Sequence, residues 1–138
     1  MPHRTCQRLF LLLTPLSLLA CSIPEPGISG TDLPAIPRVT LNSSDVTGSQ
    51  GGVPTSGRFD FTGPVYDALE RLRWISRAYV EAGWTPESPE GSQAKATQVF
   101  TKPLKNKPLK RVVTITALAS QTDGSVLVEL HSEALASE

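Results

Sequence analysis

The 138-residue sequence contains only two cysteines, Cys6 and Cys21, and only two histidines. This excludes a fold held together by several disulfides, which needs many paired cysteines. It also leaves too few ligands for a zinc site, which takes three or four. His131 has only Glu129 beside it on the same face of a predicted strand. We therefore expect no metal and no cofactor.

An excess of charge of one sign is also lacking. The chain has 13 basic and 13 acidic residues, for a formal net charge of zero. A domain that binds nucleic acid typically carries a strong excess of Lys and Arg, so the composition argues against nucleic acid as a partner. No phosphate-binding loop, serine elbow or paired-carboxylate motif is present. We therefore predict that the protein is not an enzyme.

No hydrophobic run is long enough for a comfortable membrane span. The longest, residues 9–19, is interrupted by Pro15, and a transmembrane helix needs about 20 apolar residues. Arg4 and Arg8 precede the run, and no acidic residue occurs before Glu25. A basic start, a short apolar middle and a small-residue exit are typical of a secretory signal peptide. We predict that residues 1–20 form one.

The run closes on Leu18-Leu19-Ala20-Cys21. This tetrapeptide resembles the lipobox of bacterial lipoproteins, a resemblance that covers the first fifth of the chain. It implies that the Cys21 thiol receives a diacylglyceryl group, that the chain is cut before Cys21, and that the new amine is acylated. Stable anchoring takes at least two acyl chains, each buried CH₂ contributing about 0.8 kcal/mol. The alternative is a plain secreted protein with a chance cysteine at its cleavage site.

The resemblance also implies a location and the loss of all free thiols. With Ser22 rather than Asp after the cysteine, a Gram-negative lipoprotein is expected at the outer membrane, facing the periplasm; elsewhere the outer face of the cell membrane is expected. Cys6 would be removed with the signal peptide, and Cys21 would be alkylated. The remaining chain would have 11 basic and 13 acidic residues, because residues 1–20 hold two arginines and no acid.

Residues 21–57 are rich in Pro, Gly, Ser and Thr and have few large apolar side chains. Such a segment buries too little surface to offset the entropy of ordering it. We predict a flexible linker there, between the lipid anchor and a folded domain. Within it, residues 33–41 are more apolar. Either this stretch packs on its own domain or stays loose, or it adds as a strand to a partner's sheet, with these contacts: Leu33, Ile36, Val39 and Leu41.

Residues 58–138 predict a small α+β domain. Apolar residues at three- and four-residue spacing indicate an amphipathic helix over residues 64–82, ended by Gly83. Alternating patterns predict strands at 58–61, 94–101, 112–119 and 126–132, the last two as a hairpin. The order is β-α-β-β-β, with one helix packed on a mainly antiparallel sheet. This order resembles compact domains of envelope-assembly lipoproteins, although no residue motif of one such family is present.

Two features suggest contacts with other molecules. Trp74 lies off the apolar stripe of the helix among arginines, as in many interfaces; packing within its own domain is the alternative.

Residues 102–111 repeat Lys-Pro-Leu-Lys and predict a basic hairpin loop, because proline disfavours a central strand. The loop either stays solvated or contacts an anionic ligand, at about 1 kcal/mol per basic residue, through these side chains: Lys102, Lys105, Lys107, Lys110 and Arg111.

We therefore expect a lipid-anchored lipoprotein of the bacterial envelope. Its expected role is that of a non-enzymatic accessory or assembly component, which docks on a protein complex for secretion, pilus formation or outer-membrane assembly. The alternative is a binding module for an anionic envelope ligand, such as lipopolysaccharide or peptidoglycan, through residues 102–111. The role as an accessory or assembly component predicts two partners, the membrane through Cys21 and an envelope protein.

Overall fold

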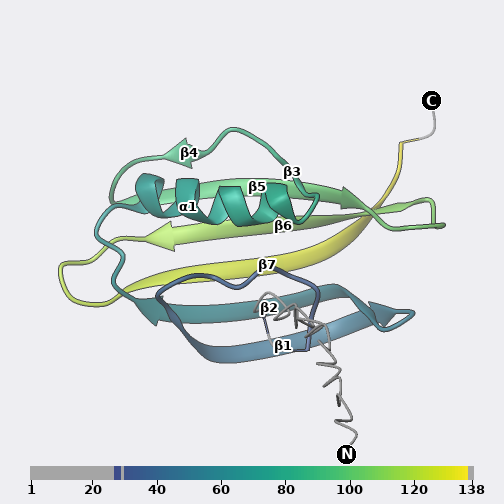
Figure 1. Cartoon of the computed structure of the whole chain (residues 1–138), viewed down its shortest axis with the longest axis horizontal. Coiled ribbons are helices and arrows are strands. Elements are labelled where there is room, and N and C mark those ends of the chain that lie inside the picture. The colour runs from purple at the N-terminus through teal and green to yellow at the C-terminus, as the bar shows by residue number, and fades with distance from the viewer. Residues whose placement is uncertain (1–26, 29, 137–138) are drawn as a thin grey trace, which may run out of the picture.

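The computed structural model describes residues 27–28 and 30–136. In this part of the chain, one helix packs on a seven-stranded antiparallel sheet (Figure 1). The elements are β1 (Thr40–Gln50), β2 (Val53–Gly63), α1 (Ala68–Glu81), β3 (Thr85–Pro86), β4 (Glu90–Gly91), β5 (Lys95–Pro103), β6 (Leu109–Leu118) and β7 (Gly124–Ala134). The predicted α+β fold is confirmed. The predicted signal peptide, residues 1–20, and Cys21 lie outside the described residues.

The strand order is β1-β2-β7-β6-β5-β3, and the short β4 also pairs with β5. The predicted order β-α-β-β-β corresponds to β2, α1, β5, β6 and β7. After β2 the chain crosses the sheet through α1 to β5, then returns through β6 and β7, so that β7 pairs with β2. The two-residue strands β3 and β4 lie between α1 and β5 and pair along the outer edge of β5.

The core lies between the sheet and α1. Side chains alternate between the two faces of a strand, and the hairpin predicted at residues 112–119 and 126–132 is confirmed as β6 and β7. The residues of β6 and β7 that belong to the core cluster are Val113, Ile115, Ala117, Val126, Val128 and Leu130. They face the buried residues of the helix, Ala68, Leu72, Ile75 and Tyr79. Together these form one hydrophobic cluster.

The helix starts later than predicted. Its N-cap is Asp67, whose carboxylate accepts a hydrogen bond from the Glu70 amide at 3.0 Å. The predicted start near Pro64 is wrong because β2 continues to Gly63, so residues 64–66 carry the chain from the sheet to the helix. The predicted end is confirmed: Gly83 has φ 87°, a left-handed conformation that glycine adopts readily. Trp84 then turns into the core, where it is buried.

The predicted linker over residues 21–57 is wrong for the described part. Ile28, Leu33 and Ile36 belong to the core cluster and are nearly inaccessible to solvent. Figure 1 shows why: α1 lies over β5 and β6, and the segment after residue 30 crosses over β7 and β2 on the same face of the sheet. This segment therefore covers apolar surface that the helix leaves bare. Few large apolar residues suffice, because only a narrow strip needs covering.

The rest of the predicted linker forms a β-hairpin. Strands β1 and β2 pair in antiparallel register, with irregularities near Ser43 and Gly48. Gly51 and Gly52 both have positive φ, 58° and 78°, as a tight two-residue hairpin turn requires. The side chains of β1 are mostly exposed. The strand is held by backbone pairing at the sheet edge, which its polar composition does not oppose.

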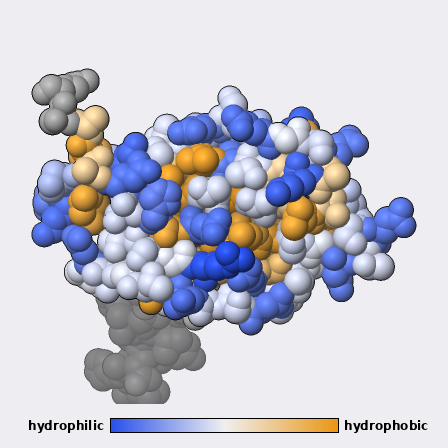
Figure 2. Space-filling model, turned by 180° about the vertical axis from the view of Figure 1, so that it is seen from behind, coloured by the Kyte–Doolittle hydropathy of each residue, from blue (hydrophilic) through white to orange (hydrophobic). Residues whose placement is uncertain are grey.

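The opposite face of the sheet is solvated. Figure 2 shows it as mostly polar, with scattered apolar patches. Thr97 and Thr116 share a hydrogen bond at 3.1 Å across β5 and β6. Arg58 bridges Asp60 at 3.3 Å and Glu129 at 3.4 Å. These pairs keep the face polar, and the exposed ion pairs of Arg58 each contribute little to stability.

Tyr79 offers a first test of the core. Its hydroxyl is buried and has no hydrogen-bond partner among the described residues, and burial raises its pKa. Because an unsatisfied buried polar group costs about 1–3 kcal/mol, we expect Tyr79→Phe to raise the free energy of unfolding by about 1 kcal/mol. Urea unfolding followed by circular dichroism measures this. If Tyr79→Phe instead lowered the free energy of unfolding by more than about 1 kcal/mol, the hydroxyl would have a hydrogen-bond partner.

Candidate functional site

The structure places the predicted docking stretch inside its own domain. Leu33 and Ile36 are buried, and Val39 and Leu41 are half-buried and packed against the core. Their side chains are therefore not free to bind a partner, and the strand-addition hypothesis for residues 33–41 is wrong. The alternative, packing on the protein's own domain, is confirmed.

The predicted basic loop is also mostly engaged within the domain. Strand β5 extends to Pro103 and β6 begins at Leu109, so only residues 104–108 form the turn. The Lys102 ammonium donates a hydrogen bond to the Ala82 carbonyl at 2.7 Å, and Lys110 lies 3.4 Å from Glu133. Lys105 and Lys107 are exposed at the turn. The prediction of a five-charge contact surface is therefore wrong.

Arg111, the fifth basic residue of the predicted loop, lies in β6 and has a structural role. It is 3% exposed, and its guanidinium donates two hydrogen bonds to the Asp32 carboxylate, at 2.7 and 2.8 Å. It also lies over the Trp84 ring, 5.0 Å from the centroid. The hydrogen bonds from Arg111 lower the pKa of Asp32, although partial burial opposes this. This pair fixes the N-terminal segment to β6.

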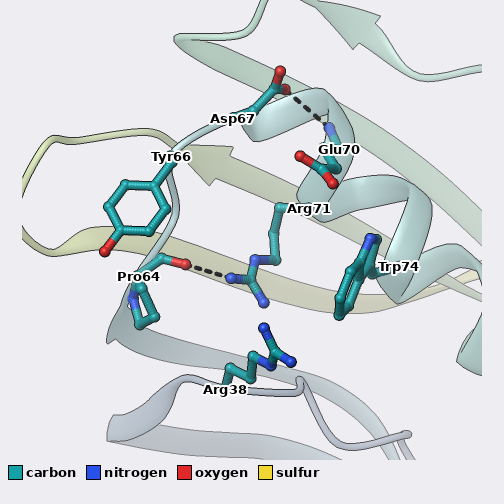
Figure 3. A pocket seen from close by; sticks show the side chains of 7 residues that line it. All are labelled: Arg38, Pro64, Tyr66, Asp67, Glu70, Arg71 and Trp74. Atoms are coloured by element: carbon teal, nitrogen blue, oxygen red, sulfur yellow. Dashed lines mark hydrogen bonds between the residues drawn. The ribbon is translucent and has the colours of Figure 1, made fainter.

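Trp74, the remaining predicted contact residue, is 42% exposed and borders a pocket of about 210 Å³. We call this the Arg38–Arg71 pocket (Figure 3). Its lining residues are Arg38, Pro64, Tyr66, Asp67, Glu70, Arg71 and Trp74. The Arg38 guanidinium carbon lies 5.2 Å from the centroid of the Trp74 ring. Tyr66, on the other side of the pocket, is 72% exposed.

Arg71 connects the two backbone segments that meet at the pocket. Its guanidinium donates one hydrogen bond to the Pro37 carbonyl at 2.9 Å and another to the Pro64 carbonyl. The pKa of Arg71 is lowered, first by burial and then by the charge of Arg38, while Glu70 opposes this. Neither Arg38 nor Arg71 forms a salt bridge within residues 27–28 and 30–136. The pocket thus holds two adjacent cations without a paired anion.

The sequence alone indicates only part of this site. Arg71 and Trp74 are three residues apart on the helix, so their proximity is predictable from helical spacing. Arg38 comes from the segment expected to be a linker, and Tyr66 from residues expected to be helical. Their positions follow from tertiary contacts, and no local pattern marks them.

The described residues contain no cluster of three or more His, Cys, Asp or Glu side chains suited to a metal. His131 instead lies 3.0 Å from Glu133, on the solvated end of β7. No helix in the part of the chain that the structure describes has the length and apolar character needed to cross a membrane. No protein-family model, curated protein or solved structure matches the chain.

Proposed function

We propose that this protein is a lipid-anchored, non-enzymatic docking module of the bacterial envelope, which binds an envelope protein through Trp74 and the Arg38–Arg71 pocket. One observation carries the proposal. A half-exposed tryptophan, an exposed tyrosine and two arginines that form no salt bridge with any described residue surround one pocket. Trp, Tyr and Arg are the residue types that dominate binding energy at protein interfaces.

The anchor proposed at Cys21 would hold this domain close to the membrane. Gly27, where the described fold begins, is six residues after Cys21, and six residues span at most about 20 Å. Gly27 lines a pocket at the C-terminal end of α1, which Ala78, Glu81 and Ala82 also line. The Arg38–Arg71 pocket lies at the N-terminal end of the helix. A helix of this length spans about 20 Å, which favours a protein partner over the bilayer as the ligand of the pocket.

The test is to express the full chain in bacteria and to compare Cys21→Ala and Trp74→Ala variants by fractionation and crosslinking in cells. We expect Cys21→Ala to leave the membrane fraction. Trp74→Ala should stay in that fraction and lose its crosslinked protein partner at least tenfold, because removal of a hot-spot residue costs about 2 kcal/mol or more.

Val80→Ala is the matched control for Trp74→Ala. Val80 is 49% exposed on the same helix and does not line the pocket, so its replacement should leave the crosslink intact. An unchanged crosslink in Trp74→Ala would contradict docking at this pocket. A Cys21→Ala protein that still fractionates with the membrane would contradict the lipid anchor.

A further inference from the structure

The two arginines of the Arg38–Arg71 pocket come from different segments of the chain and lie close together. In Figure 3 the guanidinium groups of Arg38 and Arg71 point toward each other, with Tyr66 and Trp74 on opposite sides. Arg38 has φ 60°, a left-handed backbone conformation that is uncommon for a residue other than glycine. Such conformations persist where the surrounding structure enforces them, often at binding sites. Here the residue in this conformation is Arg38, whose guanidinium lies over the Trp74 ring and next to the guanidinium of Arg71.

The two arginines have unused hydrogen-bonding capacity. A guanidinium has five N–H donors, and two of those of Arg71 go to the carbonyls of Pro37 and Pro64. Arg38 makes no side-chain hydrogen bond within residues 27–28 and 30–136. Partial burial and then the charge of Arg38 lower the pKa of Arg71, and the charge of Glu70 offsets this only in part. An anion between the two guanidinium groups would offset the repulsion between Arg38 and Arg71. It would also accept hydrogen bonds from their remaining N–H groups.

We propose that the Arg38–Arg71 pocket is a carboxylate-binding site that receives one acidic group, an Asp or Glu side chain or a C-terminal carboxylate, from the protein partner. The planar fork of a guanidinium matches a carboxylate, which both arginines contact at once. The identification of the carboxylate as part of a protein rests on the proposed function. The binding of a carboxylate in this pocket does not depend on that function.

The other residues of the pocket favour a carboxylate over a phosphate. Asp67 and Glu70 also line it, so the lining has two acidic and two basic side chains. A dianionic phosphate or an anionic lipid surface would meet repulsion from these acids, and a single carboxylate would meet less. The rings of Tyr66 and Trp74 offer apolar contact for the chain on either side of an acidic residue, as aromatic residues do at interfaces. A pocket of about 210 Å³ has room for one side chain.

The experiment is a titration of the full chain, in neutral detergent micelles, followed by the indole N–H resonances in NMR spectra. The probe is N-acetylglutamate amide, which presents one carboxylate, and N-acetylglutamine amide is its neutral control. We expect the carboxylate to shift the Trp74 resonance saturably and the neutral analogue to leave it unchanged. The Trp84 resonance should stay constant, because Trp84 is buried away from this pocket.

Variants test whether the pocket arginines are responsible. Arg38→Gln should weaken binding about tenfold, and Arg38→Lys should also weaken it because the bidentate fork is lost. Arg38 is exposed, so its replacement should leave the fold intact. Arg73→Gln is the matched control, since Arg73 is exposed on α1 and outside the pocket lining.

Three results would overturn the inference: no saturable shift with the carboxylate, an equal loss of affinity in Arg73→Gln, or a stronger response to inorganic phosphate or to phosphatidylglycerol vesicles. Carboxylate binding that depends on Arg38 would support the inference whatever the crosslinking result. If Trp74→Ala kept its crosslink in cells, that result would contradict the proposed docking function alone. Conversely, a crosslink that depends on Trp74, without carboxylate binding, would leave the docking function and remove this inference.

Discussion

Replacing Leu33 by alanine is expected to lower the free energy of unfolding by about 3 kcal/mol, within the 2–5 kcal/mol typical of buried Leu→Ala changes. Leu33 has no solvent exposure and belongs to the core cluster. Its replacement should leave a cavity between the N-terminal segment and the sheet. Because a change of 1 kcal/mol shifts the melting temperature of a domain of this size by about 4–8 °C, a fall on the order of 15 °C should follow. Thermal unfolding of the full chain, monitored by circular dichroism, measures it.

Leu135→Ala is the matched control for this experiment. Leu135 lies after β7 and is 43% exposed, so the same chemical change should cost less than about 0.5 kcal/mol. The comparison separates a core segment from a flexible linker. If Leu33→Ala and Leu135→Ala melted at the same temperature, residues 27–39 would not belong to the folded domain.

Asp32→Asn is expected to lower the free energy of unfolding by about 2–3 kcal/mol at neutral pH. The substitution keeps the shape of the side chain and leaves Arg111, which is 3% exposed, without its counterion. Breaking a buried ion pair costs about 3–5 kcal/mol. The Asp32 side chain is 41% exposed, so water screens the pair and the expected cost is smaller. Urea unfolding at pH 7 measures the loss.

The same variant has an expected pH signature. Hydrogen bonds from Arg111 lower the pKa of Asp32 in the folded protein, whereas the unfolded value is about 3.9. The contribution of a carboxyl with a lowered pKa is fully present above its unfolded pKa and is lost as pH falls through the folded pKa. The wild-type protein should therefore lose stability below about pH 4, and Asp32→Asn should lose less over the same range.

Asp45→Asn is the control for the pH experiment, because Asp45 is exposed on β1. It should unfold at the wild-type urea concentration and keep the wild-type acid dependence. Should Asp32→Asn show the full wild-type loss of stability in acid, the pair with Arg111 would contribute nothing to the pH dependence, contrary to this prediction.

Local sequence patterns determined the helix and the strands around it. Alternating β-branched residues fix which face of β6 and β7 is buried, and three- and four-residue spacing fixes the buried face of α1, because both periods are properties of the backbone. Gly83 ends the helix as its conformational freedom predicts. The lipobox-like Leu18-Leu19-Ala20-Cys21 is likewise a local signal, and the lipid anchor proposed from it depends on no feature of the fold.

Tertiary structure alone decided the role of residues 27–57 and the make-up of the candidate site. Strand β1 is polar and forms through backbone pairing with β2, so its composition resembles that of a linker. Asp32 and Arg111 are 79 residues apart in sequence, and Arg38 meets Trp74 only because the N-terminal segment crosses the sheet. Burial and charge pairing depend on which surfaces the whole fold leaves uncovered, and a short window of sequence contains no information about that.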